Sequence, residues 1–544
     1  MKLTDEQVAA IEFKGNLVIT ACPGSGKTTV MAEKIRNVLD GLRRHQGVVA
    51  ITFTRKASKE LEQRCRRGGK DTAASFFGTI DAFCLSEIIF PFASHVFSVP
   101  PASAEPKFRA DLSAEELALV KSIEDTEGKL CSENFESYLP VLEKLFSMGC
   151  VFFDSISYLA NHILSSSDAC KRYLRARFVA VYVDEYQDSS ALQHQLFLLL
   201  LEQCGLLGVC VGDVQQSIYG WREGSPEFIR ELIISPRFTH MTIGKNHRCH
   251  SSITNYANRL YDPHCALLEG DEITVYRCEI GGDELEAASK LNTIIPQLAK
   301  RFSVSSNSKI VILTRSNKGL ERLRDKLTLP CIIYTDDELA LIESKNSRLW
   351  RSLLSYRFNV KLQANDIIMA HALNIDVNRD RLKKLRAVVR HVREVALEQL
   401  VPFLLQAAKT FTGNEAAENE ISALVRVTQD RELLSQYHPS GDHQVQCMTL
   451  HKSKGLEFDV VIHLDLVEWS IPFQVLNGNP KTVHYPSLEQ DLNLHYVGIT
   501  RAKLGCVLVS TTKRFNAKGI ATAAKTSCFF DLPGLGGLFK QVRK

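Results

Sequence analysis

The sequence predicts an α/β protein with two parallel β-sheets, each interrupted by a helical insert. Three observations lead to this prediction. Short apolar runs alternate with stretches of helical spacing, the alternation occurs in two separate parts of the chain, and a glycine-rich turn follows the first run. Parallel strands need long crossover connections, usually helices, so this alternation is typical of parallel sheets. The chain of 544 residues is long enough for three or four compact domains.

The strands of the first sheet are expected in the first half of the chain, with a helical stretch after each of the first two. The strands lie at 16–20 (NLVIT), 48–53, 178–183 and 207–211, and the helices at 30–39 and 55–64. Residues 91–171 interrupt this set with a helix-rich insert. We therefore expect a first α/β domain at 1–90 and 172–260, with the insert at 91–171.

The strands of the second sheet are expected at 310–313, 331–334, 445–449, 460–464 and 506–510. A second helix-rich insert, at 342–440, separates them. The second α/β domain is therefore expected at 261–341 and 441–544.

Composition excludes several classes of protein. Fifteen cysteines without a CxxC pair indicate reduced thiols rather than disulfides or a zinc ribbon. No leader-like segment opens the chain and the apolar run near 196–201 is too short to cross a bilayer, so we expect a cytoplasmic protein without membrane contact. A net charge of +4 does not decide whether the chain binds nucleic acid.

One group of histidines and cysteines was considered as a metal site, but its spacing matches no known site, and a metal there is disfavoured. It comprises His247, Cys249, His250, His264 and Cys265.

The turn after the first strand has the composition of a phosphate-binding loop. Residues 21–28 (ACPGSGKT) match that loop except that Ala21 replaces its first glycine. Lys27 is suited to the β- and γ-phosphates and the Thr28 hydroxyl to Mg²⁺. The thiol of Cys22, beside a helix N-terminus, either has a lowered pKa or is a small neutral filler. The predicted nucleotide contacts in this segment are Ala21, Cys22, Pro23, Gly24, Ser25, Gly26, Lys27, Thr28 and Thr29.

Two carboxylates follow the apolar strand VAVYV. Asp184 and Glu185 stand where the strand would end beside the phosphate loop. Asp184 is suited to bind Mg²⁺, and Glu185 to orient or deprotonate the attacking water. An acidic pair after a strand is more often a solvated loop, but the phosphate loop favours a catalytic role.

A series of further motifs resembles the UvrD, Rep and PcrA branch of superfamily 1 helicases. They appear in the order of that family: ITFTRKASKELEQR (51–64), FGTIDAF (77–83), VDEYQDSS (183–190), VGDVQQSIYGW (211–221), NHR (246–248), TLHKSKGLEF (449–458) and YVGITRAK (496–503). The resemblance implies two RecA-like P-loop NTPase domains, with Mg²⁺-ATP between them and single-stranded DNA crossing both. The DEYQD and SIYGW blocks are similar to those of enzymes that move from 3′ to 5′.

The resemblance also implies nucleotide contacts outside the phosphate loop. Gln7 matches the glutamine that contacts adenine, and Gln216 matches a γ-phosphate sensor. Arg248 and Arg501 match two arginines that approach the γ-phosphate when the cleft closes, which would neutralise charge in the transition state. Glu457 matches a ribose contact, and His247 replaces a tyrosine that stacks on adenine.

For DNA, the resemblance implies three stacking aromatics and four phosphate or sugar contacts. The aromatics are Phe53, Tyr219 and Trp221, and core packing is the alternative for Phe53. The polar contacts are Thr54, Arg55, Thr79 and His451. Asp81 replaces a histidine of the family, which removes a DNA donor and weakens the case for strong unwinding.

In the second insert, a helical pattern separates apolar from basic residues. The apolar face comprises Leu382, Leu385, Val388, Val389, Val392 and Ala396, and the basic face comprises Lys383, Arg386, Arg390 and Arg393. The basic face is either solvated or binds a duplex or a partner.

These features predict an ATP-dependent 3′-to-5′ DNA translocase or helicase that binds single strands and junctions of single- and double-stranded DNA. The alternatives are a DNA-end-sensing regulatory ATPase with little unwinding and a stand-alone repair helicase. The segment GTIDAFCLSEIIFPF (78–92) and the chain length also resemble the compact helicase subunit of Gabija anti-phage systems. That resemblance implies a separate nuclease partner.

Overall fold

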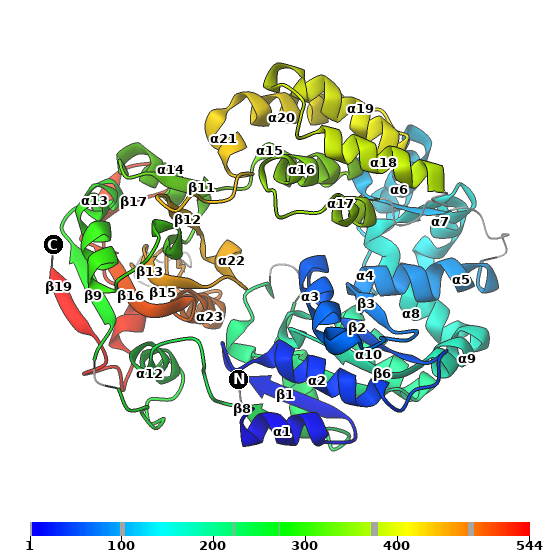
Figure 1. Ribbon diagram of the computed structural model, residues 1–544, viewed down its shortest axis with the longest axis horizontal. Helices are drawn as coiled ribbons and strands as arrows, with labels where there is room; N and C mark the ends of the chain where they lie inside the picture. Colours follow the sequence, from blue (N-terminus) through cyan, green and yellow to red (C-terminus); the bar gives the residue numbers. More distant parts are fainter. Residues whose placement is uncertain are drawn as a thin grey trace.

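The computed structural model describes residues 3–97, 104–220, 224–270, 272–371, 379–476 and 483–543. Two large sheets organise it, and all strand pairs in both are parallel. In Figure 1 the first sheet lies at the lower right and the second at the left, with the second insert above them in yellow. The α/β fold class predicted from sequence is confirmed.

The first sheet has six strands in the order β3-β2-β6-β7-β1-β8. Their bounds are β1 (Leu17–Ala21), β2 (Gly47–Ile51), β3 (Phe76–Gly78), β6 (Phe178–Val183), β7 (Leu207–Gly212) and β8 (Thr239–Ile243). The helices that position the site are α1 (Asp5–Glu12), α2 (Lys27–Leu39), α3 (Arg55–Cys65), α4 (Ile80–Phe83), α10 (Ala191–Cys204) and α11 (Glu227–Ile234). A core lies on each face of this sheet, so its four central strands, β2, β6, β7 and β1, are almost wholly apolar.

The second sheet has seven strands in the order β11-β12-β10-β13-β16-β9-β19. Their bounds are β9 (Val275–Ile280), β10 (Ile310–Thr314), β11 (Cys331–Tyr334), β12 (Val445–Thr449), β13 (Phe458–His463), β16 (Ala502–Thr511) and β19 (Lys540–Arg543). Its main helices are α12 (Ser251–Arg259), α13 (Glu284–Arg301), α14 (Asn317–Lys326), α22 (Leu450–Ser453) and α23 (Leu488–Ile499). This sheet too has a core on each face.

Both inserts are mainly helical. The first contains α6 (Ala114–Glu127), α7 (Phe135–Ser147), α8 (Ile156–Ser166) and α9 (Asp168–Arg177), with the short strands β4 (Glu105–Lys107) and β5 (Cys150–Phe152). The second contains α15 (Glu338–Leu341), α16 (Lys345–Phe358), α17 (Ala364–His371), α18 (Arg379–His391), α19 (Leu400–Thr412), α20 (Glu418–Gln429) and α21 (Arg431–Ser435). The second insert has its own apolar core around Trp350.

Helix α12 packs with the second sheet rather than the first. Ile253, Tyr256 and Leu260 share a core with Val275 and Val461 of the second sheet. The boundary predicted at residue 260 had placed this helix in the first domain. Packing instead joins it to the second, because its apolar face is buried there.

The amphipathic pattern of the second insert is realised only in part. Leu385 and Val389 are buried in α18, whereas Ala396 is exposed beyond the helix end. Arg393 does not belong to a free basic face. Its guanidinium donates to the carbonyls of Tyr356, Asn359 and Leu362 and lies 3.8 Å from the centre of the Tyr356 ring.

No helix in the part of the chain that the structure describes is both long enough and apolar enough to cross a bilayer.

Candidate nucleotide and DNA sites

The phosphate loop joins β1 to α2 at the carboxyl edge of the first sheet. Gly24 and Gly26 adopt φ values of 72° and 83°, which side chains other than glycine rarely adopt. Gly26 caps α2, so Lys27 is the first residue of a 13-residue helix. The unpaired N–H groups and the dipole at such a helix start favour an anion.

Gln7, a predicted nucleotide contact, lies against this loop. Its side-chain amide donates to the carbonyl of Ser25 at 2.8 Å, and its amide oxygen accepts from the backbone N–H of Thr4 at 2.9 Å. Gln7 is buried, and a Cβ at Gly26 would lie 2.9 Å from its amide nitrogen. The helix α1 and the phosphate loop therefore fit closely at this point.

The carboxylates of Asp184 and Glu185 follow β6 directly, and the backbone N–H of Glu185 donates to Asp184 at 2.9 Å. Burial and the neighbouring Glu185 raise the pKa of Asp184 to about 7. Burial also acts on Glu185, but Lys27 and Lys454 outweigh it and lower that pKa to about 2. Two adjacent carboxyl groups at the end of a strand are suited to bind a cation.

Arg501 and Gln216 meet across the two halves of the molecule. The guanidinium of Arg501 donates to the side-chain oxygen of Gln216 at 3.1 Å, and the Gln216 amide donates to Asp213 at 2.7 Å. Arg501 is 2% exposed, and burial together with Arg248 lowers its pKa to about 10. These predicted γ-phosphate residues from different sheets therefore lie together.

Arg248 is positioned beside the phosphate loop. A Cβ at Gly24 would come within 2.5 Å of the Arg248 Cβ, and the backbone N–H of His247 donates to the Gly24 carbonyl at 3.1 Å. The Arg248 guanidinium pairs with Glu457 at 2.6 Å, and Glu457 also pairs with Lys503 at 3.0 Å. Glu457, predicted as a ribose contact, is thus engaged by two cations, while the His247 side chain is exposed.

Lys454 was not singled out from the sequence, although it lies in the TLHKSKGLEF block. Its ammonium pairs with Asp188 at 2.5 Å and donates to the Gln216 carbonyl at 2.8 Å. It also lies 4.8 Å from the centre of the Tyr219 ring. Asp188 is 1% exposed at its side chain, and burial raises its pKa to about 6 although Lys454 opposes this. The only signal in the sequence was that one motif carries a lysine and the motif at 183–190 carries acids. Their spacing in the sequence does not show that the two side chains meet.

Two of the three predicted DNA aromatics, Phe53 and Tyr219, lie near this lysine. Phe53 and Tyr219 stack with ring centres 5.4 Å apart and planes 12° from parallel, and His451 lies 6.4 Å from Tyr219. Phe53 is 46% exposed, which removes core packing as its explanation. Trp221 lies outside the described residues.

The predicted polar DNA contacts occupy the starts of helices. The hydroxyl of Thr54 caps α3 and that of Thr79 caps α4. Arg55 is engaged by the second insert, because its guanidinium donates to the Ala370 carbonyl. The neighbouring Lys59 pairs with Asp366 of the same insert.

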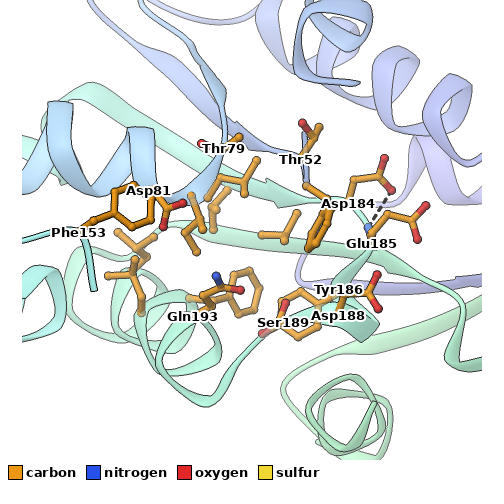
Figure 2. Close-up of a pocket in the computed structure, with 18 of the residues that line it drawn as sticks. Thr52, Thr79, Asp81, Phe153, Asp184, Glu185, Tyr186, Asp188, Ser189 and Gln193 are labelled. Carbon is orange, nitrogen blue, oxygen red and sulfur yellow. Dashed lines mark hydrogen bonds between the residues drawn. The ribbon is translucent and has the colours of Figure 1, made fainter. Parts of the chain in front are cut away.

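A cavity of about 340 Å³ runs from the carboxylates to Asp81. Figure 2 shows Asp184 and Glu185 at one end of this cavity and Asp81 with Phe153 at the other. Arg348 of the second insert also lines it. Burial raises the pKa of Asp81, while Arg348 and Arg55 lower it, and burial prevails.

The surroundings of Cys22 decide between the two alternatives for its thiol. Burial and Asp213 raise the pKa of the Cys22 thiol to about 12, so the alternative of a lowered pKa is wrong and the neutral filler remains. Among the described residues, no group of three or more His, Cys, Asp or Glu side chains could hold a metal ion.

The fold and the phosphate loop define the class: a P-loop nucleotide hydrolase with two α/β units whose residues meet at one site. Comparison with protein-family models identifies the family within this class. The UvrD/REP helicase N-terminal domain matches residues 3–136 and 103–235, and the UvrD-like helicase C-terminal domain matches residues 351–513. Together these matches span more than half of the chain. The protein belongs to the UvrD/Rep family of ATP-dependent DNA helicases.

Similar proteins include the Gabija protein GajB of Bacillus cereus, 26% identical, with 94% of this chain and 96% of the relative aligned. The ATP-dependent DNA helicase PcrA of Leuconostoc citreum is 23% identical, with 94% of this chain and 82% of the relative aligned. The ATP-dependent DNA helicase Rep of Escherichia coli is 22% identical, with 100% of this chain and 96% of the relative aligned.

Proposed function

We propose that this helicase is a motor that moves from 3′ to 5′ on single-stranded DNA, with ATP bound between its two α/β units. Lys27 binds the β- and γ-phosphates at the start of α2. Glu185 orients and deprotonates the attacking water. We assign residues 1–90 and 172–250 to the first α/β domain, and 251–341 and 441–544 to the second, with the inserts at 91–171 and 342–440.

Mg²⁺ is proposed to bind at Thr28 and Asp184. The residues fit such an ion, because the Asp184 carboxylate follows its strand directly and lies beside the Glu185 carboxylate. Burial, and after it the charge of Glu185, raises the pKa of Asp184, so a cation there would stabilise the charged form. Hydroxyl and carboxylate oxygens are the ligands that Mg²⁺ prefers. When bound, the ion would neutralise phosphate charge during hydrolysis.

The proposed γ-phosphate sensors come from both halves of the chain. Gln216 and Arg501 already share a hydrogen bond, and Arg248 lies against the phosphate loop. A bound γ-phosphate would compete for these donors and draw the two halves together. Hydrolysis and phosphate release would remove that attraction, so each ATP cycle closes and opens the cleft.

The single observation that carries the motor proposal is the position of Lys454. Its ammonium contacts Asp188, four residues from Asp184, and also lies over Tyr219, which stacks on Phe53. A change in bound nucleotide that moves Asp188 would therefore also move Lys454, and with it the aromatic rings that are proposed to stack on the bases. Phe53, Tyr219 and Trp221 are proposed to stack on DNA, while Thr54, Arg55, Thr79 and His451 contact its backbone.

The direction of movement is tested with biotinylated single strands bound by streptavidin at one end or the other. A 3′-to-5′ motor displaces streptavidin from the 5′ end and leaves it at the 3′ end. Displacement from the 3′ end alone would reverse the assigned polarity.

We further propose that the motor serves a defence system of the Gabija type, with a separate nuclease as partner. The resemblance of residues 78–92 and the similarity to the Gabija protein GajB over nearly the full length of both chains support this. Co-expression with a nuclease of this type from the same source should give one complex on size-exclusion chromatography. Phage resistance should be lost in Lys27→Ala. Independent elution, or resistance unaffected by that change, would favour a stand-alone repair helicase.

A regulatory ATPase that senses DNA ends is the second candidate. The observation that favours it is the engagement of Arg55 by the second insert, together with Asp81 at the neighbouring cavity. Strand-displacement and DNA-stimulated ATPase assays on the same preparation separate the two. A sensor would hydrolyse ATP without separating strands, including on junction substrates.

A further inference from the structure

Side-chain hydrogen bonds connect both ends of helix α1 to the phosphate loop and to α2, the helix that follows this loop. At its start, Gln7 donates to the carbonyl of Ser25 at 2.8 Å. At its end, the ammonium of Lys34 donates to the carbonyls of Ala10, Ile11 and Phe13, at 2.9, 3.4 and 2.5 Å. Lys34 lies in α2, two turns after Lys27, so both attachments lead to the same helix and loop.

The attachment at Lys34 is a buried one. Lys34 is 4% exposed, and its three N–H groups have three carbonyl acceptors, while the ring of Phe13 lies 5.9 Å from the ammonium. The last carbonyls of a helix have no partner within it and form its negative end, so a cation is favourable there. A charge this deeply buried is stable only because these acceptors replace its water.

The position of α1 matters because Gln7 is the proposed contact to adenine. Its amide has one donor hydrogen in use at Ser25 and one acceptor position in use at Thr4, which leaves one of each for a base. Adenine presents an amino donor beside a ring acceptor, whereas guanine presents two acceptors. The Gln7 amide distinguishes adenine from guanine only if its oxygen and its nitrogen both lie opposite the matching atoms of the base.

The eight residues of α1 are too few for a stable isolated helix, so its position depends on its attachments. The bonds from Lys34 do not involve Gln7, so they hold the end of α1 without using a donor or acceptor that the base would need.

We infer that Lys34 is a positioning residue for recognition of the nucleotide base, because its ammonium fixes the end of α1 and thereby the place of Gln7. This inference rests on the proposed role of Gln7. The Lys34 ammonium is buried against three carbonyls, so Lys34 acts through Gln7 and not by binding the nucleotide itself. Lys34 favours ATP over GTP because it holds Gln7, the residue proposed to contact the base, in place.

The charge of Lys34 adds a dependence on pH. Burial lowers its pKa to about 8. The groups that face the ammonium are the three carbonyls and the Phe13 ring. Beside these carbonyls in the sequence, the charged residues are Glu12 and Lys14, and both are exposed. On α2, the charged residues near Lys34 are Glu33 and Arg36, which form an ion pair at 3.3 Å. Above pH 8 the neutral amine keeps two donors for three acceptors, so the attachment weakens.

Arg36 provides a matched control on the same helix. Its guanidinium donates to the carbonyls of Arg64, Cys65 and Arg67 at the end of α3, as Lys34 does at the end of α1. Arg36→Met therefore removes a comparable helix attachment without disturbing Gln7. It should leave nucleotide choice unchanged.

The experiment measures kcat/KM for ATP and for GTP at saturating single-stranded DNA in Lys34→Met, Lys34→Arg, Arg36→Met and Gln7→Ala. The ratio of the two values does not depend on the fraction of active enzyme. Lys34→Met should lower the ratio about tenfold, mainly through KM for ATP, which is the order of one lost hydrogen bond. Lys34→Arg should keep the ratio, since arginine supplies enough donors and stays charged.

The pH profile gives a second measurement that does not require Lys34→Met to fold. Between pH 7 and 9, the ratio should fall for the natural protein relative to that for Lys34→Arg, which does not titrate there. Superimposable profiles, or a normal ratio in Lys34→Met beside a lowered one in Gln7→Ala, would overturn the inference. A normal ratio in Gln7→Ala would instead overturn the proposed role of Gln7 and remove the basis for Lys34.

Discussion

Lys454 and Asp188 form an ion pair at 2.5 Å that joins the end of α22, in the second α/β unit, to the segment after β6 of the first sheet. The side chain of Asp188 is 1% exposed and that of Lys454 10% exposed. The pair lies between the carboxylates and the aromatic stack. Its residues therefore belong to both proposed sites.

Lys454→Met should uncouple the two sites. The change leaves the Asp188 carboxylate buried without its cation and removes the charge over Tyr219, so DNA-stimulated ATPase should fall at least about tenfold while basal ATPase changes less. Lys452→Met is the matched control, because Lys452 pairs with Asp336 within its own half of the molecule. Equal loss of basal and stimulated activity in Lys454→Met would indicate a role in folding alone.

Glu185→Gln should bind ATP and fail to hydrolyse it. The amide keeps the shape and a hydrogen bond to Gln187 but lacks the negative charge and basicity needed to activate water. A loss of about 10²- to 10⁴-fold in kcat is expected. Fluorescent nucleotide titration checks binding, and loss of that binding would assign Glu185 a structural role.

Phe53→Ala should weaken the response to DNA more than the basal ATPase. The ring is 46% exposed and stacks on Tyr219, so its removal leaves no cavity in a core but shortens the platform for bases. Stacking contributes about 1–3 kcal/mol per base, which corresponds to about a tenfold higher DNA concentration for half-maximal stimulation. Ile234→Ala, at an 83% exposed residue of α11, is the control. An unchanged DNA titration would contradict the stacking role.

The stability of the second α/β unit should fall in mild acid. His463 and His495 are fully buried, and the rings are linked at 3.2 Å. Burial lowers the pKa of His463 to about 4, so the unfolded chain takes up a proton below about pH 6.5 that the folded chain refuses until about pH 4. The free energy of unfolding should therefore decrease by about 1.4 kcal/mol per pH unit in this window for this group.

Thermal denaturation from pH 7.5 to pH 5 measures this effect. His463→Gln removes the titrating group, and its Tm should depend less steeply on pH than that of the natural protein. Parallel Tm profiles for the two proteins would show that acid sensitivity originates elsewhere.

The sequence by itself determined the features that depend on neighbouring residues. Apolar runs predicted the central strands of both sheets, such as β6 and β10, because strands buried on both faces need apolar side chains throughout. The loop at 21–28 and the acids at 184–185 were also evident, since a strand followed by a turn places their side chains at one sheet edge. The edge strand β8 was missed, because its THMTI sequence alternates exposed and buried positions weakly.

Only the tertiary structure decided which distant residues share an environment. It joined Lys454 to Asp188, brought Arg501 to Gln216, placed α12 on the second sheet and set Lys34 beneath the end of α1. Each of these depends on how separate elements pack. A lysine in a helix has the same local pattern whether it faces water or three carbonyls, and only packing distinguishes the two.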